Sequence, residues 1–263
     1  MNPYNFAALF FAFGTFFLGL LVLLKRRDRV GVYFFVFSVF VTGWGIGYSI
    51  LINGSASYES ALFGARFCNT SALFVPVTWV NFILVFLGYE KQRKRLLYFL
   101  YAVAFSVLPF SFSGWFVPSV AKNLIPGFAN YAQPGPVFHL FTLLFFLAVP
   151  YGFIQLVKAA KEATGENLVQ LRAFIIATLF GYIGGSLTFA PVYGIKIPQY
   201  GVFLMPIYPF IMAYATIRHR LFDIEQVAQA FQREKLATIG LIASSVNHEI
   251  RNPLYAVKSL LES

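Results

Sequence analysis

The chain has 263 residues, of which 59% are hydrophobic and only 11% are charged. A soluble domain of ordinary composition carries about 25% charged residues, and the mean hydropathy of +0.70 leaves more apolar surface than one soluble core can bury. Composition therefore argues against a soluble enzyme and a disordered chain, and it indicates an integral membrane protein. The single cysteine, Cys68, excludes a disulfide framework and a thiolate metal site.

Seven apolar segments have about the length of a membrane-spanning helix, which needs about 20 residues at a rise of about 1.5 Å per residue. They are residues 4–24, 30–52, 64–88, 96–112, 137–157, 172–191 and 200–217. Lipid offers no partner for unpaired backbone groups, so the spans are expected to be helical. The sequence thus predicts an all-α, polytopic seven-helix transmembrane bundle, with a cytoplasmic amphipathic coiled-coil helix after it.

Cationic residues predict the orientation of this bundle. They concentrate in the segments after the first, third, fifth and seventh spans: Lys25, Arg26, Arg27 and Arg29, then Lys91, Arg93, Lys94 and Arg95, then Lys158 and Lys161, then Arg218 and Arg220. The positive-inside rule places these segments in the cytoplasm, with the N-terminus outside and the C-terminus inside. The net charge of +10 is then explained by anionic lipid headgroups of the bilayer rather than by nucleic acid.

The first span is expected to be retained as a helix, because no positive residue precedes it, whereas a cleaved signal peptide begins with positive charge. On the opposite side, the longest loop covers residues 113–136 and is rich in aromatic residues and proline. Such an apolar loop is expected to lie on the membrane surface or to cap the bundle.

The tail after Arg218 is amphipathic rather than lipid-like. Apolar residues recur at a 3–4 heptad spacing at Leu236, Ile239, Ala243, Val246, Ile250, Pro253, Val257 and Leu260. This spacing predicts a helix that packs against partner helices, and hence a homodimer formed through the tail. The register breaks between Phe231 and Leu236, where the winding of a coiled coil would change locally.

His248 lies within this seam, at a heptad position that faces away from the packed side if Val246 and Ile250 face inward. Glu249 next to it can accept the imidazole N–H and raise the nucleophilicity of the other ring nitrogen. Pro253 removes a backbone donor and should bend the helix. The alternative is a solvated surface histidine; a His-Glu-x-x-His zinc site is excluded, because the fourth residue after His248 is Asn252, and no metal site is predicted.

The stretches Leu236-Ala-Thr-Ile-Gly240 and Asn247-His-Glu-Ile-Arg-Asn-Pro-Leu254 resemble the H-box of sensor histidine kinases. The resemblance implies that His248 is the phospho-acceptor, Glu249 its acid/base partner, Asn252 a polar residue of the reaction site and Pro253 the residue that bends the helix. Residues 208–224 resemble the exit of the seven-helix sensor module in one class of these kinases.

The resemblance implies three parts: a seven-transmembrane sensor domain at 1–217, a signalling linker helix at 218–235, and the first helix of a dimerisation and histidine phosphotransfer domain at 236–263. It further implies a bacterial inner membrane, a response regulator as partner, and ATP with Mg²⁺ bound by a kinase domain. No ATP-binding motif follows His248, so that domain is expected on another chain or in a longer polypeptide.

Polar residues within the spans are candidates for ligand binding, because polar groups in lipid are costly and often mark a ligand path. These candidates are Arg66, Asn69, Asn81 and His139. Alternatively, Arg66 and His139 extend to the headgroups from the outer ends of their helices, and Asn81 bonds a neighbouring helix. Aromatic side chains such as Trp44, Tyr48 and Trp79 are first of all packing residues, although a cavity among them could admit a hydrophobic ligand.

Two other classes of protein remain as alternatives. One is a seven-helix transporter or receptor whose tail only mediates dimerisation; the absence of acidic residues from the predicted spans argues against a proton- or cation-coupled carrier. The other is a membrane-embedded enzyme, which would need a cluster of His, Asp or Glu within the helices, and His139 alone does not make one.

Overall fold

The computed structural model describes residues 2–125 and 128–218, and this part of the chain is mostly helical. Its elements, in chain order, are α1 (Pro3–Lys25), α2 (Arg29–Ile52), α3 (Tyr58–Phe86), α4 (Lys94–Val107), the 3₁₀-helix η1 (Leu108–Phe110), the strands β1 (Val120–Ile125) and β2 (Phe128–Ala132), α5 (Phe138–Glu162), α6 (Gly165–Leu187), α7 (Phe189–Val192), the 3₁₀-helix η2 (Tyr200–Phe203) and α8 (Ile207–Arg218). The linker after 218 and the coiled-coil tail predicted from sequence lie outside the described residues.

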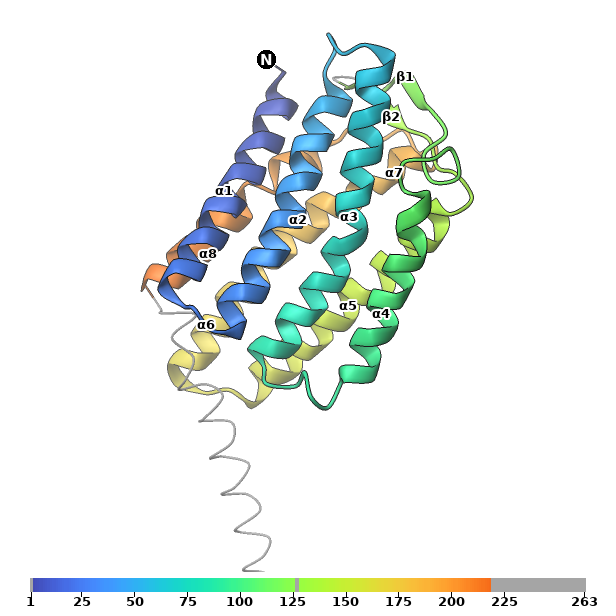
Figure 1. Ribbon diagram of the computed structural model, residues 1–263. Helices are drawn as coiled ribbons and strands as arrows, with labels where there is room; N and C mark the ends of the chain where they lie inside the picture. Colours follow the sequence, from blue (N-terminus) through green and yellow to red (C-terminus); the bar gives the residue numbers. More distant parts are fainter. Residues whose placement is uncertain (1, 126–127, 219–263) are drawn as a thin grey trace, which may run out of the picture. The chain divides into compact units, whose positions relative to one another are not determined.

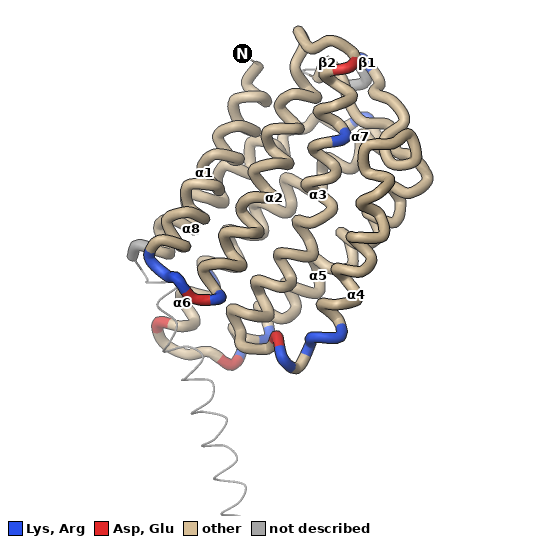
Figure 2. Tube along the Cα trace, viewed as in Figure 1, with Lys and Arg blue, Asp and Glu red and all other residues tan. Residues whose placement is uncertain are grey.

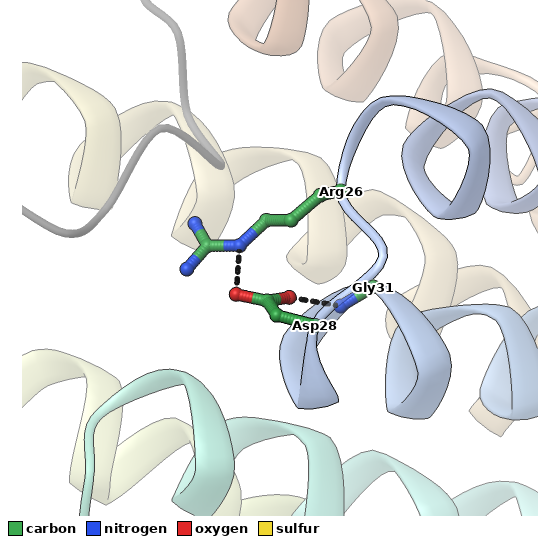
Figure 3. Close-up of polar contacts among 3 residues, drawn as sticks. All are labelled: Arg26, Asp28 and Gly31. Carbon is green, nitrogen blue, oxygen red and sulfur yellow. Dashed lines mark hydrogen bonds and ion pairs between the residues drawn. The ribbon is translucent and has the colours of Figure 1, made fainter.

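Polar residues at the helix starts explain where the first two helices begin. The Asn2 side chain accepts a hydrogen bond from the Tyr4 N–H, at 3.1 Å, with Pro3 in the first turn. The carboxylate of Asp28 accepts from the Gly31 N–H at 3.1 Å and also pairs with Arg26 Nε at 2.5 Å (Figure 3). A Cβ atom at Gly31 would overlap the Arg26 carbonyl oxygen, so glycine permits the sharp turn between α1 and α2.

Helix α3 begins before the predicted span and ends at a glycine cap. Ser57 accepts a hydrogen bond from the Ser60 N–H at 3.1 Å, and this cap starts the helix at Tyr58 rather than at residue 64. At the other end Gly88 has φ of 72°, and the Tyr89 N–H bonds the Leu84 carbonyl at 2.7 Å. This is the Schellman arrangement, for which glycine is favoured because it adopts positive φ without strain.

The long helices form a closed ring (Figure 1). Each of α1, α2 and α3 packs against the next, α3 also contacts α4 and α5, and α5 contacts α6. Helix α8 closes the ring by packing against both α6 and α1. The first helix and the last described helix are therefore neighbours, although they lie at opposite ends of the described sequence.

Small residues bring α2 and α3 into close contact. A Cβ atom at Gly47 would lie 2.6 Å from the Cys68 backbone nitrogen, and one at Gly43 would lie 2.6 Å from Ser71 Oγ. On α3, a Cβ atom at Gly64 would lie 2.8 Å from the Leu51 nitrogen. Without Cβ atoms at these positions the backbones approach closely, and close packing is the main attraction between helices in lipid.

The loop 113–136 contains an antiparallel β-hairpin, which the all-α prediction did not include. Val120 pairs with Ala132, Ala121 with Tyr131 and Lys122 with Asn130. Strand β2 packs against α2, α3 and α7, so the hairpin covers one end of the bundle, which is one of the two placements expected for this loop. Residues 120–132 show no clear period-2 alternation of apolar and polar residues, so the sequence does not predict these strands.

Five described helices are long and apolar enough to cross a membrane: α1, α2, α3, α5 and the segment Gly165–Val192. The fourth predicted span corresponds to α4, which has 14 residues and changes to η1 at Leu108–Phe110, where Pro109 cannot continue the helical hydrogen bonds. The seventh corresponds to the shorter apolar region Tyr200–Thr216, in which Pro206 lies between η2 and α8. A count of seven spans stays a prediction.

Charged residues lie at the two ends of the bundle and not along its middle (Figure 2). The turns α1–α2, α3–α4 and α5–α6 gather most of the described lysines and arginines at one end. An ion pair of 2.8 Å between Arg29 and Glu90 joins two of these turns. The hairpin end holds few cationic residues, among them Arg66 and Lys122. Lysine and arginine are thus concentrated at the end of the bundle that the positive-inside rule assigns to the cytoplasm.

Candidate functional site

A cavity of about 80 Å³ lies inside the ring of helices. Its wall comes from α1, α2, α3, α5, α6, α7 and α8, and it is mainly aromatic and aliphatic. Six phenylalanines contribute to it: Phe11, Phe37, Phe138, Phe141, Phe145 and Phe189. We call it the inner cavity. Apolar cavities of this kind are typical of sites for small molecules.

A second cavity of about 40 Å³ lies beneath the hairpin, and we call it the outer cavity. Phe128, Asn130, Tyr131 and Ala132 of β2 form one side of it, and residues of α2, α3 and α7 form the others. Gln199, just before η2, also lines this cavity.

The two cavities adjoin, because Trp44, Asn69, Thr188 and Val192 line both of them. Trp44 stacks on Tyr48 with ring centroids 5.0 Å apart, which fixes the indole at this junction. The hairpin thus covers the outer cavity, and the inner cavity lies next to it, deeper among the helices. The cavity among aromatic residues anticipated from sequence is present, with Trp44 and Tyr48 in its walls and Trp79 packed behind it.

Each cavity is lined by two residues with a buried polar atom that has no hydrogen-bond partner among the described residues. These are the hydroxyls of Tyr182 and Tyr208 for the inner cavity, and the Tyr131 hydroxyl and Gln199 Oε1 for the outer one. Buried polar atoms nearly always have a partner, and each one left without costs about 1–3 kcal/mol. All four belong to residues in the cavity walls, and the described residues leave their hydrogen bonds unmade.

Tyr131, one of two tyrosines that line the outer cavity, is uncharged at neutral pH. Burial raises the pKa of Tyr131 to about 12, since desolvation disfavours the phenolate. At neutral pH the Tyr131 hydroxyl can both donate and accept a hydrogen bond. Gln199 Oε1 accepts only, while the Nε2 of the same side chain donates to the Ile197 carbonyl at 3.2 Å. The Tyr131 hydroxyl and Gln199 Oε1 together thus provide one donor and two acceptors.

The structure places one of the four predicted ligand residues, Asn69, at the cavities. Its Nδ2 donates to the Ala65 carbonyl of the preceding turn at 2.8 Å. Asn81, deeper in α3, donates to the Tyr101 hydroxyl of α4 at 2.9 Å; it bonds a neighbouring helix, which was the alternative for this residue. Ligand binding by any of the four stays a prediction.

Arg66 contacts the loop that carries the hairpin, His139 lies in the first turn of α5 after that loop, and neither lines either cavity. Arg66 Nε donates to the Val117 carbonyl at 3.2 Å and so ties α3 to the loop that carries the hairpin. His139 Nδ1 lies 3.0 Å from the Tyr193 hydroxyl, which is also 2.8 Å from Thr142 Oγ1. The arrangement joins α5 to the turn after α7. The four candidates are therefore dispersed rather than gathered in one site.

The H-box residues His248, Glu249, Asn252 and Pro253 lie outside the described residues, and their predicted roles stay predictions. Within residues 2–125 and 128–218, no group of three His, Cys, Asp or Glu side chains could hold a metal ion. Sequence reasoning missed Tyr182 and Tyr208, because a tyrosine in an apolar helix gives no sign of whether its hydroxyl is paired. It also missed Gln199, which lies just before η2 and outside the apolar runs that were searched for polar residues.

Comparison with known proteins agrees with the sensor-module resemblance found in the sequence. No curated protein matches it significantly. A model of the family described as the N-terminal 7TM region of histidine kinase matches residues 7–225. This range begins within α1 and includes every later described helix and the hairpin. The match covers most of the chain and ends before the H-box sequence. The family match and the H-box resemblance therefore rest on different residues. The chain therefore belongs to the family of N-terminal seven-transmembrane regions of histidine kinases.

Proposed function

We propose that the chain is the membrane sensor part of a two-component histidine kinase, which detects a membrane or extracytoplasmic signal and controls phosphorylation of His248. The observation that carries this proposal is the order of its parts: the family match ends at residue 225, and the H-box sequence follows from Leu236 to Leu254. A response-regulator aspartate would then receive the phosphoryl group. The tail would form a homodimer.

The position of α8 supports a sensory role. Tyr208 of α8 lines the inner cavity, and α8 is the last described element before the linker and the H-box. A molecule that binds more tightly to one position of α8 than to another would shift the population between them. Such a shift would couple binding in the cavity to the part of the chain that follows α8.

The proposed setting is the bacterial inner membrane, with the N-terminus outside. Reporter fusions after Arg95 and after Lys122 are expected to report opposite sides of the membrane, the first cytoplasmic and the second external. The physical reason is the concentration of cationic residues in the turns α1–α2, α3–α4 and α5–α6. Alkaline phosphatase and a fluorescent protein, each active on one side only, make the measurement. Activity of the same reporter at both points would contradict the orientation.

A phosphorylation assay tests the function. The chain, extended after Ser263 with the rest of a histidine kinase that supplies the second dimerisation helix and the ATP-binding domain, is placed in lipid vesicles with Mg²⁺ and radiolabelled ATP. It is expected to gain phosphate that is lost in acid and retained in base, the behaviour of a phosphorus–nitrogen bond. The matched control is the same extension on residues 218–263 alone. Equal labelling of both proteins under every condition tried would show that the membrane region exerts no control.

A further inference from the structure

Two glycines of α6 border open space in the inner cavity. A Cβ atom at Gly185 would meet no other part of the chain within 4 Å, and one at Gly181 would lie no closer than 3.6 Å to Tyr208. Both glycines line the inner cavity. By contrast, a Cβ atom at Gly184 would overlap the Gly201 carbonyl oxygen, which is the close approach that usually explains a glycine in a membrane helix.

Helix packing does not explain Gly181 and Gly185. Glycine in the interior of a helix is less favourable than alanine, because it loses more backbone freedom on folding. At Gly184 this cost is offset by close packing against η2, whereas alanine would fit at the other two positions. What the missing Cβ atoms provide at Gly181 and Gly185 is room in the cavity.

Four phenylalanines of α5 and α7 form an aromatic wall of the same cavity. The ring of Phe189 lies 5.5 Å from that of Phe141 and 4.9 Å from that of Phe145, between centroids. Phe141 lies 5.2 Å from Phe138 in the same way. Rings that hold one another in place form a wall that needs little further ordering when a molecule binds.

The polar side chains of the cavity wall bond within their own segments. Thr178 and Thr188 each donate the hydroxyl hydrogen to a carbonyl of α6, at 2.8 and 2.6 Å, and Asn69 donates to the preceding turn of α3 at 2.8 Å. Among the described residues, no Asp, Glu, Lys, Arg or His lines the cavity. A charged molecule would lose its hydration there with no opposite charge in return. The wall therefore favours an uncharged, apolar occupant.

The volume of the inner cavity limits what can enter it. About 80 Å³ holds roughly five to eight groups of the size of a water molecule, since each needs about 10–15 Å³ on this measure. The cavity is partly open, so this volume limits the part of a molecule that enters and not the whole molecule. A benzene ring or the end of an acyl chain has this size.

We propose that the inner cavity binds an uncharged hydrocarbon group of about the size of a benzene ring, which lies over Gly181 and Gly185 and against the phenylalanines of α5 and α7. A free apolar molecule and the end of a lipid chain are two sources of such a group. Tyr208 also lines the cavity, so the bound group would contact α8. The inference rests on the proposed sensory function for its biological meaning, whereas its test measures binding alone.

The test is photolabelling of the full chain in nanodiscs, with no ATP and no kinase domain. Two probes carry the same uncharged group: free 3-phenyl-3-(trifluoromethyl)diazirine, and a phosphatidylcholine with this group at the end of one acyl chain. Saturable labelling of residues 138–145 or 181–185 is expected from at least one probe, and which one does so identifies the source. Benzene should reduce this labelling, and benzoate, which is charged at neutral pH, should not when equal amounts are bound to the nanodiscs.

Unsaturable labelling by both probes, spread along lipid-facing residues such as Phe6 and Phe13 (60% and 48% exposed), would overturn the proposal.

A space-filling substitution tests the location. Because a Cβ atom at Gly185 meets open space, the side chain in Gly185→Leu has room to enter the cavity, and saturable labelling should fall at least about tenfold. Ala102→Leu adds the same side chain at an exposed position of α4 and should leave the labelling unchanged. Undiminished labelling in Gly185→Leu would overturn the proposed site.

Alanine substitutions at neighbouring glycines separate the cavity from helix packing. Gly185→Ala should keep or raise the unfolding midpoint in a denaturing detergent, because alanine is the better helix former and nothing obstructs its methyl group, and it should still reduce saturable labelling. Gly184→Ala should lower the midpoint, because its methyl group would overlap Gly201. A lowered midpoint in Gly185→Ala would overturn the inference that this glycine keeps the cavity open. Because no phosphate is measured, failure here is separable from failure of the kinase assay.

Discussion

Replacing Trp79 with alanine is expected to lower the free energy of unfolding by about 3–5 kcal/mol, the range for removing a large buried aromatic side chain. Trp79 is fully buried in α3 and contacts rings from three other helices: Phe37 at 5.8 Å, Phe153 at 5.8 Å and Phe174 at 5.7 Å between centroids. Gly152 of α5 leaves the space that the indole fills, since a Cβ atom there would overlap Trp79 Nε1. Trp79 thus links α3 to α2, α5 and α6.

The measurement is unfolding in mixed micelles as the fraction of a denaturing detergent rises, followed by circular dichroism. Trp115→Ala is the matched control, because Trp115 lies in the outer loop and is 62% exposed; its removal should change stability by about 0.5 kcal/mol or less. Equal destabilisation by the two substitutions would contradict the assignment of Trp79 to the packing centre. The substitution should also loosen the inner cavity, because the Tyr182 ring packs at a tilt of 58° against Trp79, with centroids 5.1 Å apart.

The helical part of the fold could be predicted from sequence because lipid leaves so few choices. A run of apolar residues such as 4–24 or 30–52 must be helical, and the structure gives Pro3–Lys25 and Arg29–Ile52. Boundaries were less accurate where a polar cap extends a helix beyond its apolar run, as Ser57 does for α3. The hairpin was not predicted, since its pairing depends on contacts with the bundle that no local pattern encodes.

The candidate site was predictable only in outline. Asn69 is polar within an apolar run, and this contrast singled it out. Arg66 and His139 stand out in the same way, yet they bond the Val117 carbonyl and the Tyr193 hydroxyl. What distinguishes Tyr182 and Tyr208 is the lack of a partner for a buried hydroxyl, and that depends on the packing of helices distant in sequence. A polar residue within an apolar run can be recognised from sequence, whereas a cavity forms only when helices distant in sequence pack together.

His248→Gln is expected to abolish the acid-labile phosphate of the extended protein described above. By the H-box resemblance, an imidazole nitrogen of His248 attacks the γ-phosphorus of ATP; the phosphorus–nitrogen bond forms as the bond to the ADP oxygen breaks, and ADP leaves. Phosphoryl transfer is catalysed mainly by positioning and charge stabilisation, so no neighbouring side chain replaces a missing acceptor. Glutamine keeps a polar side chain of similar length but offers no ring nitrogen.

Two further substitutions decide whether His248 acts as the acceptor or only supports the helix. His219→Gln alters the other cytoplasmic-side histidine predicted from the topology and should leave labelling unchanged. Glu249→Gln should slow labelling by about 10²–10⁴-fold, the usual contribution of a general acid or base, without making the phosphate stable in acid. A structural role for His248 would instead lower the detergent stability of the dimer together with the labelling. Phosphate that survives His248→Gln would refute the assignment, because the chemistry requires that one nitrogen.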